Sequence, residues 1–232
     1  MNATLFDIGA AVPNHPARYT TSLLPVMASM LRDGAAPAGG HRAHILDPFG
    51  GVGGIFQLGH WLPDAQIEAV EIEPEWAAAH PRLRQGNALH LPFDDHSFDA
   101  ICTSPCYGNR MGDTVIDSWT RYTYTSQLGR KLHPDNSGKF QWGNRYRDFH
   151  VKAWTEAKRV LIPGGSLILN IKDHIRDDRQ VYVTNWQISC LEILGFSVVD
   201  HVKVATPGMG FGQNGDKRVP YESVIHFVLE AT

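Results

Sequence analysis

Short apolar runs alternate with amphipathic stretches along most of this chain. The apolar runs have the length and composition of β-strands, whereas the amphipathic stretches repeat their apolar positions every three or four residues, as helices do. The pattern predicts strands at His44–Leu46, Ile67–Ile72, Phe98–Cys102, Ser166–Ile171, Ser197–Val204 and Ser223–Leu229, and helices at Thr20–Leu31, Trp76–His80, Phe149–Leu161 and Asn185–Leu194. Strands that alternate with helices are typical of an α/β protein with a parallel sheet covered on both faces.

The last two predicted strands leave no room for a helix between them, so we expect them to form an antiparallel hairpin. A parallel sheet with one reversed strand at its end resembles the class I methyltransferases. That resemblance implies an α/β fold with a mostly parallel, Rossmann-like sheet of seven strands whose last strand is antiparallel. The length favours one domain over residues 1–232.

Composition narrows the class of protein further. No apolar run approaches the roughly eighteen residues that a membrane span needs, and polar residues interrupt the N-terminus, so we expect no membrane span and no signal peptide. The three cysteines lack paired spacing, which favours a reducing, cytoplasmic location over a disulfide framework. Among the 12 histidines, only His41 and His44 have ligand-like spacing, and no cysteine or acid completes a set. We therefore expect no metal site.

Charge is distributed unevenly along the chain. The net charge is −3, but the segment 108–150 carries seven basic and four acidic residues and is therefore +3, while the remainder is −6. The same segment lacks a sustained period and is longer than ordinary connections, which are seldom structureless at that length. It is an insertion of basic and aromatic residues that interleave, as they do on surfaces that bind phosphates and unstacked bases.

We predict that this basic and aromatic insertion recognises the target. The candidate substrate-binding residues are Asn109, Arg110, Arg121, Tyr124, Trp142, Arg145 and Arg147. The alternative is that its aromatic residues form a satellite core under a long lid, and both descriptions can hold together. The glycine-rich segment Thr206–Tyr221 inside the final hairpin is a second candidate for contact with substrate.

A glycine cluster follows the first predicted strand, in the sequence Asp47-Pro48-Phe49-Gly50-Gly51-Val52-Gly53-Gly54. Such a loop lies at the carboxyl edge of the sheet, where open α/β sheets bind ligands. The spacing of a dinucleotide-binding loop fails, because Phe56 occupies the third glycine position. About twenty residues later a strand delivers Glu71, whose carboxylate can accept hydrogen bonds from ribose hydroxyls. The alternative is that Glu71 only begins a solvated helix.

This loop resembles the D-P-F-x-G-x-G motif of the S-adenosylmethionine-dependent DNA amino-methyltransferases, the N4-cytosine and N6-adenine type. Two further strings are similar to motifs of that family. Asn14–Thr20 resembles the segment that covers the methionine end of the cofactor, or is a plain loop before a helix, and Gly86-Asn87-Ala88 resembles the adenine-binding motif, in which the family usually has Asp where Asn87 stands. The resemblance implies S-adenosylmethionine held by Tyr19, Thr20, Asp47, Pro48, Phe49, Gly50, Gly51, Gly53, Glu71, Ile72, Asn87 and Ala88.

The string Ser104-Pro105-Cys106-Tyr107 follows the strand Phe98–Cys102, at the same edge. It resembles the (Asp/Asn/Ser)-Pro-Pro-(Tyr/Phe) motif of enzymes that methylate exocyclic amino groups, and the Ser form is associated with N4 of cytosine. A nucleobase amino nitrogen is poorly nucleophilic, so the site must accept hydrogen bonds from its N–H groups; Ser104 Oγ and the Pro105 carbonyl can do so. A base inside a duplex must be flipped out, and Tyr107 would then stack on it.

Cys106 replaces the second proline of that motif, which leaves three interpretations. It is a relaxed substitute for proline, a small buried residue, or the nucleophile of a cytosine-C5 methyltransferase, since those enzymes carry Pro-Cys at the corresponding place. The Glu-Asn-Val string expected of C5 enzymes is absent, and both Ser104 and Tyr107 match the amino-group motif. We therefore favour amino methylation and include Cys106 with Ser104, Pro105 and Tyr107 among the candidate catalytic residues.

The sequence thus predicts a DNA methyltransferase that acts on the N4 amino group of a flipped cytosine. Methylation of cytosine C5, adenine N6 or RNA remains open, as does a non-enzymatic role as a cofactor-binding accessory subunit. The expected partner is DNA rather than RNA or a membrane. The small recognition surface leaves room for a homodimer or a partner subunit.

Overall fold

The computed structural model describes residues 22–34, 42–109, 123–206 and 217–231. The helices are α1 Leu23–Gly34, α2 Pro74–Ala77, α3 Tyr124–Leu128, α4 Asn144–Val160 and α5 Val183–Ile193, with 3-10 helices η1 Gly54–His60 and η3 Ser137–Lys139. The strands are β1 His44–Asp47, β2 Gln66–Glu71, β3 Leu83–Gln85, β4 Phe98–Thr103, β5 Leu161–Ile171, β6 His174–Arg176, β7 Arg179–Val181, β8 Phe196–Ala205 and β9 Tyr221–Leu229. No helix within these ranges combines the length and apolar character needed to cross a membrane.

Seven of the strands form one sheet in the order β3-β2-β1-β4-β5-β9-β8. Strands β1 to β5 are parallel, and β9 runs antiparallel to both of its neighbours. The predicted parallel sheet with a reversed last strand is thereby confirmed, as is the hairpin of the last two strands. Because β9 is reversed, it begins at the edge where the parallel strands end.

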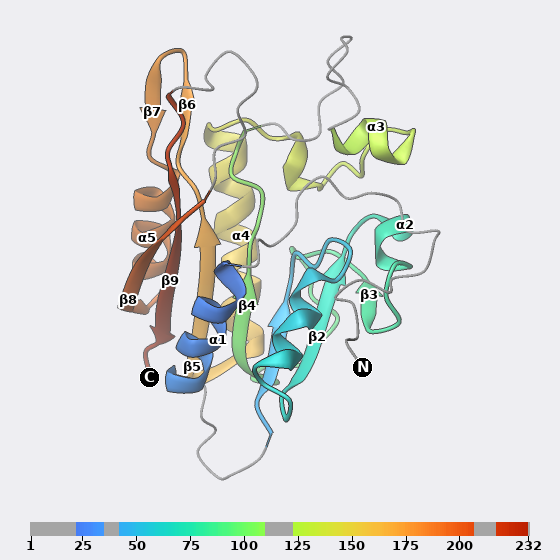
Figure 1. Ribbon diagram of the computed structural model, residues 1–232. Coiled ribbons are helices and arrows are strands. Elements are labelled where there is room, and N and C mark those ends of the chain that lie inside the picture. The colour runs from blue at the N-terminus through green and yellow to red at the C-terminus, as the bar shows by residue number, and fades with distance from the viewer. Residues whose placement is uncertain (1–21, 35–41, 110–122, 207–216, 232) are drawn as a thin grey trace, which may run out of the picture.

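Helices cover both faces of this sheet (Figure 1). On one face α1 and η1 pack on alternate strand residues such as Ile45 and Ala100, and on the other α4 and α5 pack on Leu46 and Ile101. Adjacent strand residues thus face opposite layers, as the pleat requires. Burial of both faces explains why the central strands read as continuous apolar runs.

Some predicted element boundaries were wrong. Helix α4 begins at Asn144, five residues before the predicted Phe149, so the first turn of this helix lies inside the predicted insertion. Helix α2 is a single turn that begins at Pro74, where proline is tolerated because the first helical N–H needs no partner. The short strand β3 and the hairpin β6–β7 were not predicted, because their three-residue strands contain no apolar run.

Candidate active site

The carboxyl edge of the sheet brings together the two motifs that the sequence singled out. Asp47 ends β1, Glu71 ends β2 and Thr103 ends β4. Since these strands are parallel and hydrogen-bonded in register, their ends lie at one edge. Ser104 to Tyr107 directly follow β4 and therefore lie beside the glycine loop.

Asp47 joins the two motifs through a buried hydrogen bond. Its side chain is 0% exposed, and its Oδ1 accepts hydrogen bonds from the Phe49 N–H at 2.9 Å and from the Thr103 hydroxyl at 2.6 Å. The first bond shapes the turn after β1, and the second fixes the end of β4. Asp47 thus holds the glycine loop and the residue before Ser104 in one arrangement.

The glycine loop turns tightly onto the neighbouring strand. Gly51 and Gly53 adopt φ angles of 53° and 88°, in the left-handed region that favours glycine. The Gly50 N–H donates to the Val70 carbonyl at 2.8 Å, and a Cβ added at Gly50 would lie 2.8 Å from Leu83 Cδ2. The backbone approach therefore requires glycine at position 50 for reasons of space.

Glu71 is a buried carboxyl that two backbone N–H groups address. Its Oε2 accepts from the Gly51 N–H at 3.0 Å and its Oε1 from the Glu73 N–H at 2.8 Å. Burial raises the pKa of Glu71 from 4.5 to about 8, and the charge of Glu73 adds to this effect, while the N–H groups of Glu73 and Gly51 oppose it. Each oxygen retains a further lone pair, so the hydroxyls of a ribose fit this carboxyl as additional donors.

The other candidate cofactor residues surround this loop. Pro48 is buried, Ile72 is half-buried, and the Phe49 ring packs against Phe149, His150 and Trp154 of α4. The Asn87 amide donates to Asp135 Oδ2 at 2.9 Å, while its oxygen accepts the Leu89 N–H. Ala88 is buried. Tyr19 and Thr20 lie outside the described residues.

The catalytic string belongs to a four-residue hydrogen-bond cluster that we call the hydroxyl cluster: Ser104, Tyr107, Asn170 and Glu222. Ser104 Oγ lies 2.9 Å from the Tyr107 hydroxyl, which donates to Glu222 Oε2 at 3.0 Å. The Asn170 amide nitrogen reaches Ser104 Oγ, the Tyr107 hydroxyl and Glu222 Oε2, at 3.1, 3.0 and 2.9 Å. Polar groups from the string after β4, from β5 and from β9 thus form one cluster around Ser104.

Sequence reasoning missed Glu222. This residue is the second of β9, immediately after the glycine-rich segment that was expected to face the substrate. Its Oε1 lies 3.9 Å from the ammonium of Lys172, which donates to Thr206 Oγ1 at 2.7 Å. The reversal of β9 was the available signal, because it brings the start of that strand to the catalytic edge.

The Cys106 side chain contacts a group of residues separate from the hydroxyl cluster. Its Sγ is 3.5 Å from the Tyr124 hydroxyl, and it packs against the cluster formed by Trp76, Tyr124 and Leu132. Burial raises the pKa of this thiol above its ordinary value of 9.0. A nucleophilic cysteine needs the thiolate, which this environment disfavours.

A hydroxyl from α4 restrains the backbone at Cys106. The Tyr146 hydroxyl donates to the Cys106 carbonyl at 3.0 Å and accepts from the Gln187 amide at 3.0 Å. Trp154 Nε1 in turn donates to Gln187 Oε1 at 2.6 Å. Tyr146, Gln187 and Trp154 are fully buried. Their series of hydrogen bonds therefore fixes the Cys106 carbonyl, in a string that lacks the second proline of the motif.

The candidate target-binding residues occupy different environments. Tyr124 is 4% exposed and packs edge-on against Trp76, inside the satellite core that was the alternative interpretation. Trp142 is half-buried between Tyr146 and Trp186, and the Arg147 guanidinium lies over its ring at 4.8 Å. Asn109 and Arg145 are exposed. Arg110 and Arg121 lie outside the described residues.

A buried carboxylate ties this segment to the loop after β2. Glu73 is 0% exposed, and its Oε1 accepts from the His133 N–H and the Asn136 amide, each at 2.8 Å. Its Oε2 pairs with Arg130 at 2.8 Å, and the same guanidinium pairs with Glu75. The residues after α3 are therefore anchored next to Glu71.

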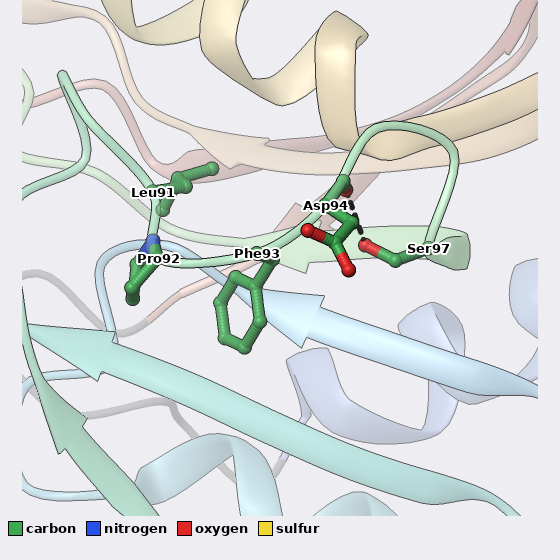
Figure 2. Close-up of a pocket in the computed structure, with 5 residues that line it drawn as sticks. All are labelled: Leu91, Pro92, Phe93, Asp94 and Ser97. Carbon is green, nitrogen blue, oxygen red and sulfur yellow. Dashed lines mark hydrogen bonds between the residues drawn. The ribbon is translucent and has the colours of Figure 1, made fainter.

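An open pocket of about 430 Å³ lies away from these groups, among Leu91, Pro92, Phe93, Asp94 and Ser97 (Figure 2). It precedes β4, at the edge opposite to Ser104, and within it the Ser97 hydroxyl donates to the Asp94 carbonyl at 2.7 Å. It holds none of the candidate residues. No group of His, Cys, Asp and Glu that could hold a metal ion occurs among the described residues either.

Solved structures with the same architecture define the class of fold. A protein from Galdieria sulphuraria, provisionally named as a sarcosine dimethylglycine methyltransferase, is 12% identical with a TM-score of 0.55, over 90% of this chain and 85% of that chain. An S-adenosylmethionine-dependent methyltransferase from Aquifex aeolicus is 14% identical (TM-score 0.50, 88% and 89% covered), and the [4+2]-cyclase SpnF is 13% identical (0.54, 94% and 85%). These likenesses show the class I methyltransferase fold.

A family model gives the more specific assignment. The model of the DNA methylase family, which covers N6 and N4 enzymes, matches residues 98–230, more than half of the chain. The chain therefore belongs to this family and is an S-adenosylmethionine-dependent methyltransferase. No curated protein sequence matches it. The glycine loop and Glu71 precede the matched region, and their geometry fits the nucleoside of that cofactor.

Proposed function

We propose that this protein transfers a methyl group to the N4 amino group of a flipped-out cytosine in DNA. The observation that carries the proposal is the position of Ser104. Its hydroxyl lies in the hydroxyl cluster at the edge where the glycine loop ends, whereas the Cys106 thiol points into a buried cluster. A hydrogen-bond acceptor beside the glycine loop supports methyl transfer to an amino group.

The residues of the string supply the chemistry that an amino group requires. Ser104 Oγ and the Pro105 carbonyl accept its two N–H bonds and localise the nitrogen lone pair. Bound S-adenosylmethionine supplies an electrophilic methyl group, so no protein nucleophile is needed. Positioning of the two reactants can contribute on the order of 7–11 kcal/mol to such a reaction.

The proposed cofactor contacts follow from the same edge. Glu71 accepts the ribose hydroxyls, and Ile72 packs on the adenine, whose amino group meets the segment at Asn87 and Ala88. Asp47, Pro48, Phe49, Gly50, Gly51 and Gly53 shape the loop, with Tyr19 and Thr20 over the methionine end. Glu71 must be ionised to accept both hydroxyls fully. Burial opposes that form, while the backbone N–H donors and the ribose hydroxyls of a bound cofactor favour it.

For the target we propose phosphate and base contacts from the basic and aromatic insertion. Asn109 and Arg145 are exposed and suited to direct contact, while Trp142 presents one half-buried ring next to Arg147. Tyr124 supports the segment from within, through Trp76 and Cys106. Arg110 and Arg121 complete the proposed basic set.

The test is to incubate the purified chain with methyl-labelled S-adenosylmethionine and either DNA or RNA, and to identify the methylated nucleoside by mass spectrometry. N4-methylcytosine in DNA is the expected product. Substituting Ser104→Ala should reduce its formation about 100-fold, because an acceptor that acts in the transition state is lost. Cys106→Ser should leave it largely intact.

Other products would overturn the proposal in distinguishable ways. Recovery of 5-methylcytosine, lost on Cys106→Ser, would identify a C5 enzyme with Cys106 as nucleophile. Recovery of N6-methyladenine would leave the assignment of the site intact but show that the target base is adenine. A methylated nucleoside found in RNA alone would show that the substrate is RNA. No transfer to any substrate would favour an accessory subunit.

A further inference from the structure

The hydrogen bonds of the hydroxyl cluster have a direction that the partners impose. A carboxylate can only accept, so the Tyr107 hydroxyl, 3.0 Å from Glu222 Oε2, must donate its proton to Glu222. The Tyr107 oxygen is then left as an acceptor for its other two neighbours, the Asn170 amide at 3.0 Å and Ser104 Oγ at 2.9 Å. Ser104 consequently donates its own proton to Tyr107.

This direction determines what Ser104 presents to a substrate. With its proton committed to Tyr107, Ser104 Oγ has two lone pairs, one of which accepts from the Asn170 amide nitrogen at 3.1 Å. Among the described residues no further group uses the other. Ser104 is therefore left with an acceptor, and with no donor, for a ligand.

Asn170 and Lys172 hold the cluster in this state. The Asn170 amide nitrogen donates to Glu222 Oε2 at 2.9 Å, so this oxygen acts as an acceptor. Burial and the charge of Glu222 raise the pKa of Tyr107 well above its ordinary value, so its hydroxyl stays protonated. The ammonium of Lys172 forms an ion pair with Glu222, at 3.9 Å from its Oε1.

We infer that Glu222 selects the class of base by setting the hydrogen-bond direction through Tyr107 to Ser104. A base with an amino group at the reacting position donates a hydrogen bond to Ser104 Oγ. A base with a carbonyl group there places a second acceptor opposite Ser104 Oγ, and no hydrogen bond forms. The site would thus accept cytosine and reject uracil or thymine. This inference rests on the proposed function and adds that Glu222, which need not touch the base, is a specificity-determining residue.

The experiment measures binding, so that it does not depend on the rate of transfer. Once the methylated position is known, duplexes with cytosine or uracil at that position are titrated against the protein in the presence of S-adenosylhomocysteine. The wild-type protein should prefer cytosine. Glu222→Ala should reduce this preference about tenfold, because Tyr107 becomes free to donate to Ser104 and Ser104 then turns its proton toward the base.

Glu222→Gln is the matched control. Its amide oxygen can take the place of Oε2, facing the donors Tyr107 and Asn170, while an amide nitrogen there would meet the Asn170 nitrogen. The hydrogen-bond direction is therefore kept although the charge is lost, and the preference for cytosine should persist. Tyr107→Phe, which interrupts the chain in the middle, should lose the preference as Glu222→Ala does.

Three outcomes would overturn the inference. One is a wild-type preference for cytosine in Glu222→Ala when thermal unfolding and cofactor binding show that this variant is folded. A second is an equal loss of preference in Glu222→Gln, which would mean that charge rather than direction matters. The third is an unchanged preference in Tyr107→Phe. If the wild-type protein forms no N4-methylcytosine at all, the proposed function fails, and that result is visible before these titrations begin.

Discussion

The proposed cofactor side and the proposed target side of the carboxyl edge are built by different means. The cofactor side consists mainly of backbone: a glycine turn, N–H groups that address Glu71, and a close approach at Gly50. The proposed target side consists of side chains from the string after β4, from β5 and from β9, which form one cluster around Ser104. A substitution that disturbs backbone space should therefore damage cofactor binding, whereas loss of one polar atom should damage transfer.

The largest expected effect concerns Glu71 and pH. The folded-state pKa of Glu71 is about 8 against 4.5, so the unfolded chain gives up this proton at lower pH than the folded protein does. In the unliganded protein, stability is therefore lost as pH rises from 4.5 towards 8, by on the order of 4 kcal/mol. Urea unfolding across this range should show a steep loss for wild type and a shallow one for Glu71→Gln.

The same variant should bind S-adenosylmethionine more weakly, because an amide offers the ribose one acceptor instead of two. Glu192→Gln on the exposed face of α5 is the matched control, and it should keep both the wild-type pH dependence and the wild-type affinity. An unchanged pH dependence in Glu71→Gln would mean that other groups cause it.

Gly50→Ala should have the next largest effect. Its Cβ would lie 2.8 Å from Leu83 Cδ2 and 2.9 Å from Ala69 Cβ, so β2 and the loop must move apart. We expect about 2–3 kcal/mol of destabilisation and weaker cofactor binding, measured by thermal unfolding and calorimetry. Gly59→Ala serves as control, since nothing lies within 4 Å of a Cβ there, and it should be close to neutral.

Arg130→Ala tests the link between the two sides. It leaves the fully buried Glu73 carboxylate without its cation, and because Arg130 is partly exposed we expect a cost of about 2 kcal/mol, less than for a fully buried pair. Adding Glu73→Gln should recover much of that loss in chemical unfolding. Glu75→Ala, which removes the more exposed partner of Arg130, should cost under about 1 kcal/mol. Equal losses in Arg130→Ala and Glu75→Ala would contradict the role of Glu73.

Tyr146→Phe should cost about 1–3 kcal/mol of stability, because the buried Gln187 amide loses its acceptor, and should have a clear effect on transfer. Losing the hydroxyl frees the Cys106 carbonyl, so we expect kcat to fall about tenfold, while the affinity for cofactor is unchanged. Restoring the second proline with Cys106→Pro in the same variant should recover the rate, because the ring restrains the preceding residue instead. Tyr182→Phe, at an exposed tyrosine, should do nothing. Failure of the proline to rescue would show that Tyr146 acts in another way.

The residues of the proposed cofactor side could be placed at one edge from the sequence, because they are local. Asp47 to Gly54 form one contiguous loop, and Glu71 ends the next strand, so a strand pattern alone places them at one edge. Glu222 could not be predicted from the sequence, because its hydrogen-bond partner Tyr107 is 115 residues away along the chain and Glu222 is a single acidic residue at the start of a strand. Glu222 reaches the hydroxyl cluster because β9 pairs with β5 in the sheet.

The boundary of the basic and aromatic insertion shows a signal that was missed. The buried face of α4 shows a helical period. Its first buried residues are three or four positions apart: Tyr146, Phe149, His150 and Ala153. Because arginines lie beside them, we interpreted this stretch as a nucleic-acid-binding surface, although a helix can carry charged residues on its outer face. Tyr146 therefore belongs to the core and to the support of Cys106.

The buried hydrogen bond between Thr103 and Asp47 has a consequence for the response of the reaction to salt. Both side chains are 0% exposed, so dissolved ions cannot screen the bond that joins the cofactor loop to the catalytic strand. Contacts from exposed arginines to phosphates weaken steeply as ions are added. Added salt should accordingly raise the KM for DNA while kcat at saturating DNA stays level, because the distance between donor and acceptor is insulated from the solution.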